Sequence, residues 1–342
     1  MENNLIEISS HAGFQPMEIC LVGRSYPPEF YSKIKNSNIR SVMEKIAIET
    51  EEDYQTLIKI LKKFQIQIER PTILANNNFE EYMIIRSDGR RWYQPPPMNP
   101  RDHLLVVGNQ IFINRPTGPT YVDFFDSVIK RIVGKKYHAK DCPDTNVING
   151  PSVTRVGKDL YFDNKYGLPQ HIFDTYFSNY RCHNVTTGGH SDGVFCPVTP
   201  GLIISLKDVP TYADTFPGWE VVYLPGQSWE KVRPFLDLKI KNGGKWWIPG
   251  EEMNDEVTNF VNSWLNDWIG FVEETVFDVN MLVIDEKNVI CNNDNDKVFE
   301  ALSRHGVTPH ICNFRHRYFW DGGLHCITLD LKRRGPCLDY FA

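Results

Sequence analysis

A short motif of two apolar runs joined by a tight turn recurs along this chain of 342 residues. Each copy predicts a β-hairpin, because β-rich runs on both sides of a glycine or polar turn are its usual signal. The copies are "HLLVVGNQIFIN" (103–114), "SVTRVGKDLYFD" (152–163), "VFCPVTPGLIIS" (194–205) and "NMLVIDEKNVICN" (280–292). No linker rich in Pro, Gly or Ser separates them, so we expect a single domain over residues 1–342.

Helical patterns accompany several of these hairpins. Apolar residues between 121 and 132 keep helical spacing, and so do those between 298 and 302, where Gly306 is placed to end the helix. Earlier in the chain, residues 50–64 predict an amphipathic helix that begins with a Thr-x-x-Asp capping pattern at Thr50. Strand-like stretches follow two of these helices. The repeating unit is therefore hairpin, helix, strand, and it is used about five times.

The two ends of the chain supply the strands that complete the fifth unit. "MEICLVGR" (17–24) and "HCITLDLK" (325–332) are the strand-like stretches left over. Repeats that each bury one face must pack against neighbours, and closing the ring removes exposed sheet edges. We expect an α/β fold in which ββαβ units form a five-bladed pseudosymmetric propeller. The alternative is a mixed α/β sheet without pseudosymmetry.

Composition excludes several classes of function. The net charge of −6 argues against non-specific nucleic-acid binding, which needs clustered Lys and Arg. The N-terminal residues do not resemble a signal peptide, and no stretch is long and apolar enough to span a membrane. The eight cysteines are scattered rather than densely spaced, so we expect free thiols in a cytoplasmic protein.

Polar residues stand at the head of several repeats. Asp102 precedes the first hairpin in "NPRDHLL", His190 and Asp192 precede the third in "GGHSDGVF", and Cys326 follows "DGG" before the closing strand. Equivalent positions of repeats around an axis converge on that axis. The sequence therefore predicts one central pocket that holds two acids, one histidine and one cysteine.

Three readings of Cys326 compete: packing, metal binding and nucleophilic attack. A lone strand cysteine usually packs as a small hydrophobe. Metal binding is disfavoured, because His325 and Cys326 are adjacent on an expected strand and should point to opposite faces, and no CxxC knuckle is present. The two glycines before Cys326 favour the close approach of a ligand or backbone. No Walker loop, G-x-S-x-G elbow or G-x-G-x-x-G fingerprint occurs, so we expect neither metal nor cofactor.

At these residues the sequence resembles the guanidine-modifying superfamily, and within it the arginine:glycine amidinotransferases. The blocks that carry the resemblance run through most of the chain and end with "GGLHCITLDLKRRG" and "LDYFA". The resemblance implies a five-bladed α/β propeller with Cys326 as nucleophile and His190 as general acid and base. Asp102 and Asp192 become the carboxylates that grip the guanidinium, which suits the fork of donors on that planar cation.

The chain departs from the family pattern at two positions. Ser152 occupies the place of an acid that orients the catalytic histidine in the amidinotransferases, so His190 should be held less firmly. Val209 occupies the place of an arginine that recognises the substrate carboxylate, and the nearby Lys207 lacks the arginine fork.

The resemblance thus implies transfer of the amidino group of L-arginine, through an amidino-cysteine, to glycine or another amine. Two alternatives remain open: a guanidine hydrolase that forms citrulline, and a catalytically weak protein that binds guanidinium. Small-molecule substrates are the expected partners, without nucleic acid or membrane, and the resemblance leaves a homodimer open.

Overall fold

The computed structural model describes residues 4–73, 83–85, 91–114, 121–187, 190–206, 212–224, 233–270 and 279–342. Within them, five three-stranded sheets share one topology, in which the first strand pairs antiparallel with the second and the second pairs parallel with the third. The sheets are β6–β7–β9 (Leu104–Val107, Gln110–Ile113, Lys135–His138), β10–β11–β12 (Val153–Val156, Asp159–Asp163, Arg181–Val185), β13–β14–β15 (Phe195–Thr199, Leu202–Ser205, Glu220–Tyr223), β16–β17–β18 (Leu282–Asp285, Asn288–Cys291, Thr308–Ile311) and β19–β2–β3 (Thr328–Arg333, Met17–Val22, Gln67–Glu69).

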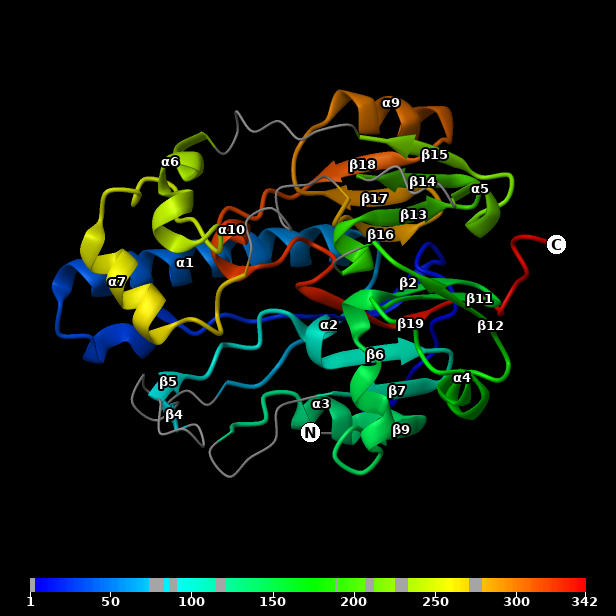
Figure 1. Cartoon of the computed structure of the whole chain (residues 1–342), viewed down its shortest axis with the longest axis horizontal. Coiled ribbons are helices and arrows are strands. Elements are labelled where there is room, and N and C mark those ends of the chain that lie inside the picture. Colours follow the sequence, from blue (N-terminus) through cyan, green and yellow to red (C-terminus); the bar gives the residue numbers. More distant parts are fainter. Residues whose placement is uncertain are drawn as a thin grey trace.

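The last of these sheets closes the ring with both ends of the chain. β19 pairs antiparallel with β2, and Leu329 lies opposite Leu21. The pairing predicted between residues 325–332 and 17–24 is therefore confirmed, and so is the five-bladed α/β propeller. Figure 1 shows β2 and β19 side by side between the sheets that come first and last along the chain.

Buried apolar clusters join each blade to its neighbours around the ring. One cluster joins the closing blade to the first, for example Leu329 to Leu104, and a second joins the first blade to β10–β11. A third spans the blades from β10 to β18, and a fourth includes both Leu282 of β16 and Val22 of β2. Because the contacts return to the blade where they began, each sheet edge that the repeat leaves open is covered by another blade.

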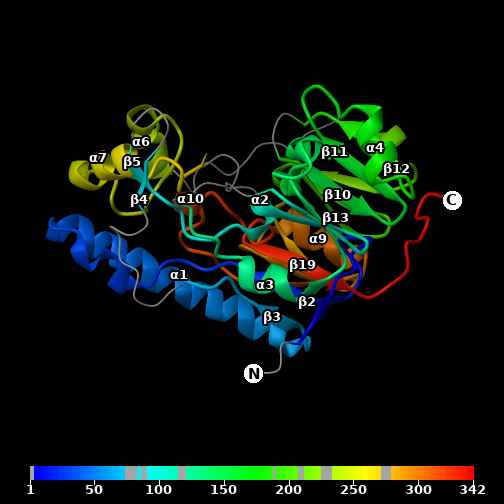
Figure 2. The same cartoon turned by 90° about the horizontal axis from the view of Figure 1, so that it is seen from below.

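The remaining elements lie between or outside the blades. Figure 2 shows α1 along one side of the β19–β2–β3 sheet, with α6, α7 and the β4–β5 hairpin beyond one end. The helices are α1 (Ser37–Lys63), α2 (Pro100–His103), α3 (Asp126–Arg131), α4 (Gln170–Tyr176), α5 (Tyr212–Thr215), α6 (Arg233–Asn242), α7 (Asp255–Trp264), α9 (Asp296–Arg304), α10 (Arg317–Trp320) and the 3-10 turns η1 (Pro28–Lys33), η2 (Pro143–Val147), η3 (Gly150–Ser152) and η4 (Ser191–Gly193). The short strands are β1 (Ile6–Glu7), β4 (Met83–Ile85), β5 (Arg91–Tyr93) and β8 (Ile132–Val133).

Two helix predictions are corrected. The first helix begins at Ser37 and is capped by the Asn36 side chain, so Thr50 is not its N-cap. Thr50 is instead fully buried in mid-helix, where its hydroxyl accepts a hydrogen bond from Trp320 Nε1 at 2.9 Å. The helix predicted between residues 121 and 132 shrinks to α3, because its last residue, Ile132, joins β8 and pairs with β1.

Candidate active site

The predicted site residues lie where the chain enters the first strand of each blade. Asp102 is in α2 just before β6, Ser152 ends η3 before β10, and Asp192 is in η4 before β13. Cys326 lies in a turn that leads into β19. First strands of a propeller run in equivalent directions, so these positions share one end of the ring, as the pseudosymmetry predicts.

Cys326 is buried and contacts two side chains from other blades. Its Sγ lies 3.4 Å from Oδ2 of Asp192, and it accepts a hydrogen bond from Asn280 Nδ2 at 3.0 Å. The thiol thus has a carboxylate on one side and an amide donor on the other. A planar cation that pairs with Asp192 would have its central carbon beside this sulfur.

Asn280 also fixes the turn that carries the sulfur. Its Oδ1 accepts hydrogen bonds from the backbone N–H of His325 at 2.9 Å and of Cys326 at 3.2 Å. A Cβ at Gly323 would come within 2.6 Å of the same oxygen, so glycine is needed there for the amide to approach. The glycine before it, Gly322, leaves equivalent room for the side chain of Asn99. The glycines therefore admit two asparagine side chains, where the sequence predicted a ligand or backbone.

His325 does not point away from the site, which corrects the sequence prediction. Residues 324–327 form a turn rather than strand, so the alternation of a strand does not apply. As a result, Nδ1 of His325 lies 2.8 Å from Oδ2 of Asp192, the same oxygen that faces Cys326. Burial and the Arg101 guanidinium lower the pKa of His325, so we assign a neutral ring that donates from Nδ1.

The charges around the sulfur keep it protonated in the free protein. Burial, followed by the carboxylates of Asp192 and Asp102, raises the pKa of Cys326 well above its ordinary value. Asp192 itself is ionised: burial opposes this, but the hydrogen bond from His325 and the nearby His190 and Arg101 lower its pKa. The site therefore holds negative charge before substrate arrives, as expected of a site for a cation.

His190 lies next to the pair of Asp192 and Cys326, but its partner is not the predicted one. Its Nε2 is 3.3 Å from the Nδ2 of Asn149. Within the described ranges, the Ser152 hydroxyl forms no hydrogen bond, and that residue bonds Asn149 through its backbone N–H. The structure thus brings Cys326 and Asp192 into contact, while Ser152 does not hold the histidine. Val209 and Lys207 lie outside the described residues.

A buried ion cluster supports the site from beneath. Asp330 of β19 is fully buried and binds the guanidinium groups of Arg101 at 2.9 Å, Arg155 at 2.6 Å and Arg333 at 2.7 Å. These three cations hold the pKa of Asp330 well below its usual range although burial opposes them. Arg101 also donates to the backbone carbonyl of His325 at 3.0 Å, which ties the nucleophile turn to the cluster.

Asn280 is the contact that sequence reasoning missed, and a signal for it was present. It stands two residues before β16, the same place that Asp102 has before β6 and that Cys326 has before β19. Applying the head-of-repeat argument to the fourth hairpin would have selected it. Its amide is neutral, whereas the search was directed at acids, histidines and thiols.

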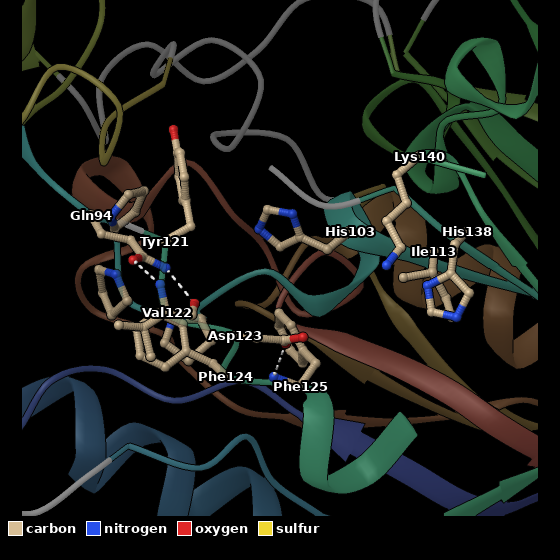
Figure 3. A pocket seen from close by; sticks show the side chains of 13 residues that line it. Gln94, His103, Ile113, Tyr121, Val122, Asp123, Phe124, Phe125, His138 and Lys140 are labelled. Atoms are coloured by element: carbon tan, nitrogen blue, oxygen red, sulfur yellow. Dashed lines mark hydrogen bonds between the residues drawn. The ribbon is translucent and has the colours of Figure 1, made fainter. Parts of the chain in front are cut away.

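A cavity of about 260 Å³ opens beside α2, next to Asp102. Figure 3 shows His103, His138 and Lys140 around it, above a floor formed by Phe124 and Phe125. No group of three or more metal-binding side chains occurs in the portion of the chain that the structure describes. No helix of that portion is long and apolar enough to cross a membrane.

Comparisons with known proteins agree with this geometry. No family model matches the chain. Curated relatives include the L-arginine:L-lysine amidinotransferase of Pseudomonas savastanoi pv. phaseolicola, which is 22% identical over 78% of this chain and 81% of its own. The mitochondrial glycine amidinotransferase of Xenopus laevis is also 22% identical, over 98% of this chain and 85% of its own.

Solved structures show the same fold. SxtG, an amidinotransferase of Microseira wollei, aligns over 98% of this chain and 100% of its own with a TM-score of 0.65 and 16% identity. The inosamine-phosphate amidinotransferase StrB1 of Streptomyces griseus aligns over 98% and 99% with a TM-score of 0.65 and 17% identity. With the sequence relatives, the blades and the Cys326 site in agreement, this chain is a member of the amidinotransferase family of the guanidine-modifying superfamily.

Proposed function

We propose that this protein moves the amidino group of L-arginine, through a covalent intermediate on Cys326, to the amino group of a second small molecule. The observation that carries the proposal is the contact of Cys326 Sγ with the Asp192 carboxylate on one side and the Asn280 amide on the other. A carboxylate beside a buried sulfur suits a substrate whose reactive carbon is the centre of a cation.

The substrate itself activates the nucleophile. The pKa of Cys326 is raised by burial and by Asp192 and Asp102, so the free site holds a thiol. A bound guanidinium neutralises the two carboxylates and lowers that pKa, which favours the thiolate only when arginine is present. The free enzyme is thereby protected from reaction with other electrophiles.

The reaction then balances in two half-reactions. The Cys326 thiolate forms an S–C bond with the guanidinium carbon, the bond from that carbon to the δ-nitrogen breaks, and His190 supplies the proton with which ornithine leaves. The acceptor amine then attacks the amidino-cysteine, gives up a proton to His190 and releases the thiolate. Water in place of the amine would give citrulline or free urea-type products instead.

Lys140 is our candidate for recognition of the substrate carboxylate, in place of the arginine that Val209 replaces. It lines the cavity beside Asp102, and within the described residues it forms no ion pair. We expect Lys140→Met to raise KM for arginine several-fold with a smaller change in kcat. Lys136→Met, on β9 outside the cavity lining, is the matched control and should leave KM unchanged.

The first test uses arginine without any added amine, followed by mass spectrometry of the intact protein and of the small molecules. We expect one amidino adduct and stoichiometric ornithine, both absent in Cys326→Ser and both retained in Cys337→Ser, whose thiol lies outside the site. Steady citrulline would assign the hydrolase. Binding of arginine with neither adduct nor product would assign the weak binding protein that Ser152 suggested.

The second test restores the missing acid and screens acceptors. Ser152→Asp should increase turnover if this position orients His190, whereas an unchanged rate with unchanged stability would show that Asn149 already does so. Glycine, L-lysine and an inosamine phosphate are the first acceptors to try, because relatives of this chain are named for them.

A further inference from the structure

A second cavity lies apart from Cys326, between α1, the segment 247–249 and α10, with a volume of about 580 Å³. None of Cys326, Asp192, His190 and Asp102 lines it. Its walls come from three parts of the chain that are far apart in sequence, so only the folded protein forms it.

Buried polar atoms of this cavity wall lack protein partners. Within the described residues, Nε of Arg317, Nδ1 of His316 and Oδ1 of both Asn292 and Asn293 are buried and form no hydrogen bond. The first three of these side chains are more than nine-tenths buried. A buried polar atom without a partner costs about 1–3 kcal/mol, so four of them around one cavity indicate a ligand that supplies the partners.

Arg317 carries a charge that no nearby acid balances. Its Nη1 donates to Asn313 Oδ1 at 3.0 Å and its Nη2 to Tyr318 Oη at 2.7 Å, and both acceptors are neutral. No carboxylate of the described chain forms an ion pair with it. An unpaired buried guanidinium is costly, and a carboxylate is the group that matches its geometry.

The other three atoms are acceptors and ask for a donor. Nε2 of His316 lies 2.6 Å from Glu49 Oε2, and burial lowers the pKa of this ring, so Nε2 carries the hydrogen and Nδ1 is left as an acceptor. Asn292 spends its Nδ2 on the carbonyl of Asn280 at 3.3 Å, which fixes its Oδ1 as an acceptor too. An ammonium group has three donors, enough for these two atoms and Asn293 Oδ1.

The charge and polarity of the remaining wall narrow the ligand further. Lys45, Arg315 and Arg317 are matched by three acidic side chains, Glu49, Glu251 and Asp294, so the lining favours a ligand without net charge. Apolar side chains complete the wall: Val42, Ile46, Ile248, Pro249 and Ile311. They suit an uncharged, apolar side chain on that ligand.

We propose that this cavity binds a zwitterionic α-amino acid with an apolar side chain, at a site separate from Cys326. Its carboxylate pairs with Arg317 and its ammonium meets His316, Asn292 and Asn293. The hydrogen bond from Asn292 to the backbone of Asn280, whose side chain holds the Cys326 turn, connects the two sites.

The test measures binding without turnover. Cys326 is first alkylated with 2-chloroacetamidine to fill the guanidinium site, and L-leucine is then titrated by calorimetry, with the fluorescence of Trp247 in the wall as a second signal. We expect saturable binding at one site. Isopentylamine, which lacks the carboxylate, and 4-methylpentanoate, which lacks the amine, should each bind at least tenfold more weakly.

Variants separate the site from the rest of the protein. Arg317→Met and Asn293→Leu should each weaken L-leucine binding at least tenfold, and the second variant keeps the test valid if the first does not fold. Arg304→Met removes an exposed arginine of α9 outside the cavity and should leave binding unchanged. Absence of saturable binding, equal binding to Arg317→Met, or equal binding of the amine alone would overturn the proposal.

A further arm identifies the source of the ligand. Unmodified protein is incubated with L-arginine and L-leucine, and guanidino-leucine is sought by mass spectrometry. Its formation would identify the bound amino acid as the acceptor, and binding without formation would identify it as an effector. Because the binding assay needs no catalysis, its result is independent of whether amidino transfer occurs.

Discussion

Replacing Asn280 by aspartate separates two jobs that one side chain performs. The Oδ1 atom accepts the backbone N–H groups of His325 and Cys326, and the Nδ2 atom donates to the Cys326 sulfur. Asn280→Asp keeps the shape and the acceptor but replaces the donor with a carboxylate oxygen. Asn280→Ala removes both.

The structure sets the size of each effect. A hydrogen bond to a charged group contributes about 1.5–3 kcal/mol, so losing the N–H donor to a thiolate should slow adduct formation about 10- to 150-fold. The added carboxylate raises the pKa of Cys326 further, beyond the effect of Asp192 and Asp102, and makes the loss larger. Asn280→Ala leaves two N–H groups without acceptors and should also lower the free energy of unfolding by about 2–4 kcal/mol.

The assay is the single-turnover rate of amidino-cysteine formation from saturating arginine, measured by quenched-flow mass spectrometry across pH. Urea unfolding of the same two variants reports stability. We expect Asn280→Asp to be slow but stable and Asn280→Ala to be slow and unstable. An Asn280→Asp rate within threefold of wild type would refute the role of the Nδ2 donor.

Three further predictions follow from the charges of the site. Alkylation of Cys326 by neutral iodoacetamide, followed on its peptide by mass spectrometry, should still accelerate above pH 9, because burial and Asp192 raise the pKa, whereas a plateau below pH 8 would contradict this reasoning. The cation 2-chloroacetamidine should react faster than iodoacetamide at pH 7.5, because it binds Asp192 first. Asp330→Asn should lower the free energy of unfolding by about 3–5 kcal/mol at pH 7, because buried arginines such as Arg155 lose their counter-charge. The pKa of Asp330 is depressed, so this difference should persist above about pH 4 and shrink only as the pH falls further; a difference that disappears near pH 7 would argue against the ion cluster. His325→Gln should raise KM for arginine about tenfold through loss of the hydrogen bond that orients Asp192, and an unchanged KM would assign His325 a purely structural role.

Local pattern was enough to predict the blades. Each hairpin has its two strands and its turn within a dozen residues, so the apolar runs and the turn residues that specify β6–β7 or β16–β17 are all visible in one short window. Pseudosymmetry then carried the argument to the site, because residues at the same place in each repeat meet at one end of the ring. That is why Asp192 and Cys326 could be paired across 134 positions of sequence.

Contacts between distant segments decided the rest. Thr50 reads as a helix cap until Trp320, far along the chain, claims its hydroxyl in mid-helix. His325 reads as the outward neighbour of Cys326 until Asn280 binds both of their N–H groups and turns the backbone before the strand begins.

The sequence by itself thus determined the repeat, its closure by the two chain ends, and the identity of the nucleophile and the acids. Only the tertiary structure decided which neutral side chains hold them, Asn280 for Cys326 and Asn149 for His190. The physical reason is that an apolar pattern is periodic along the chain and can be read locally, whereas an amide can bond to whatever donor or acceptor the fold brings to it. Its partner therefore has no signature in the sequence around it.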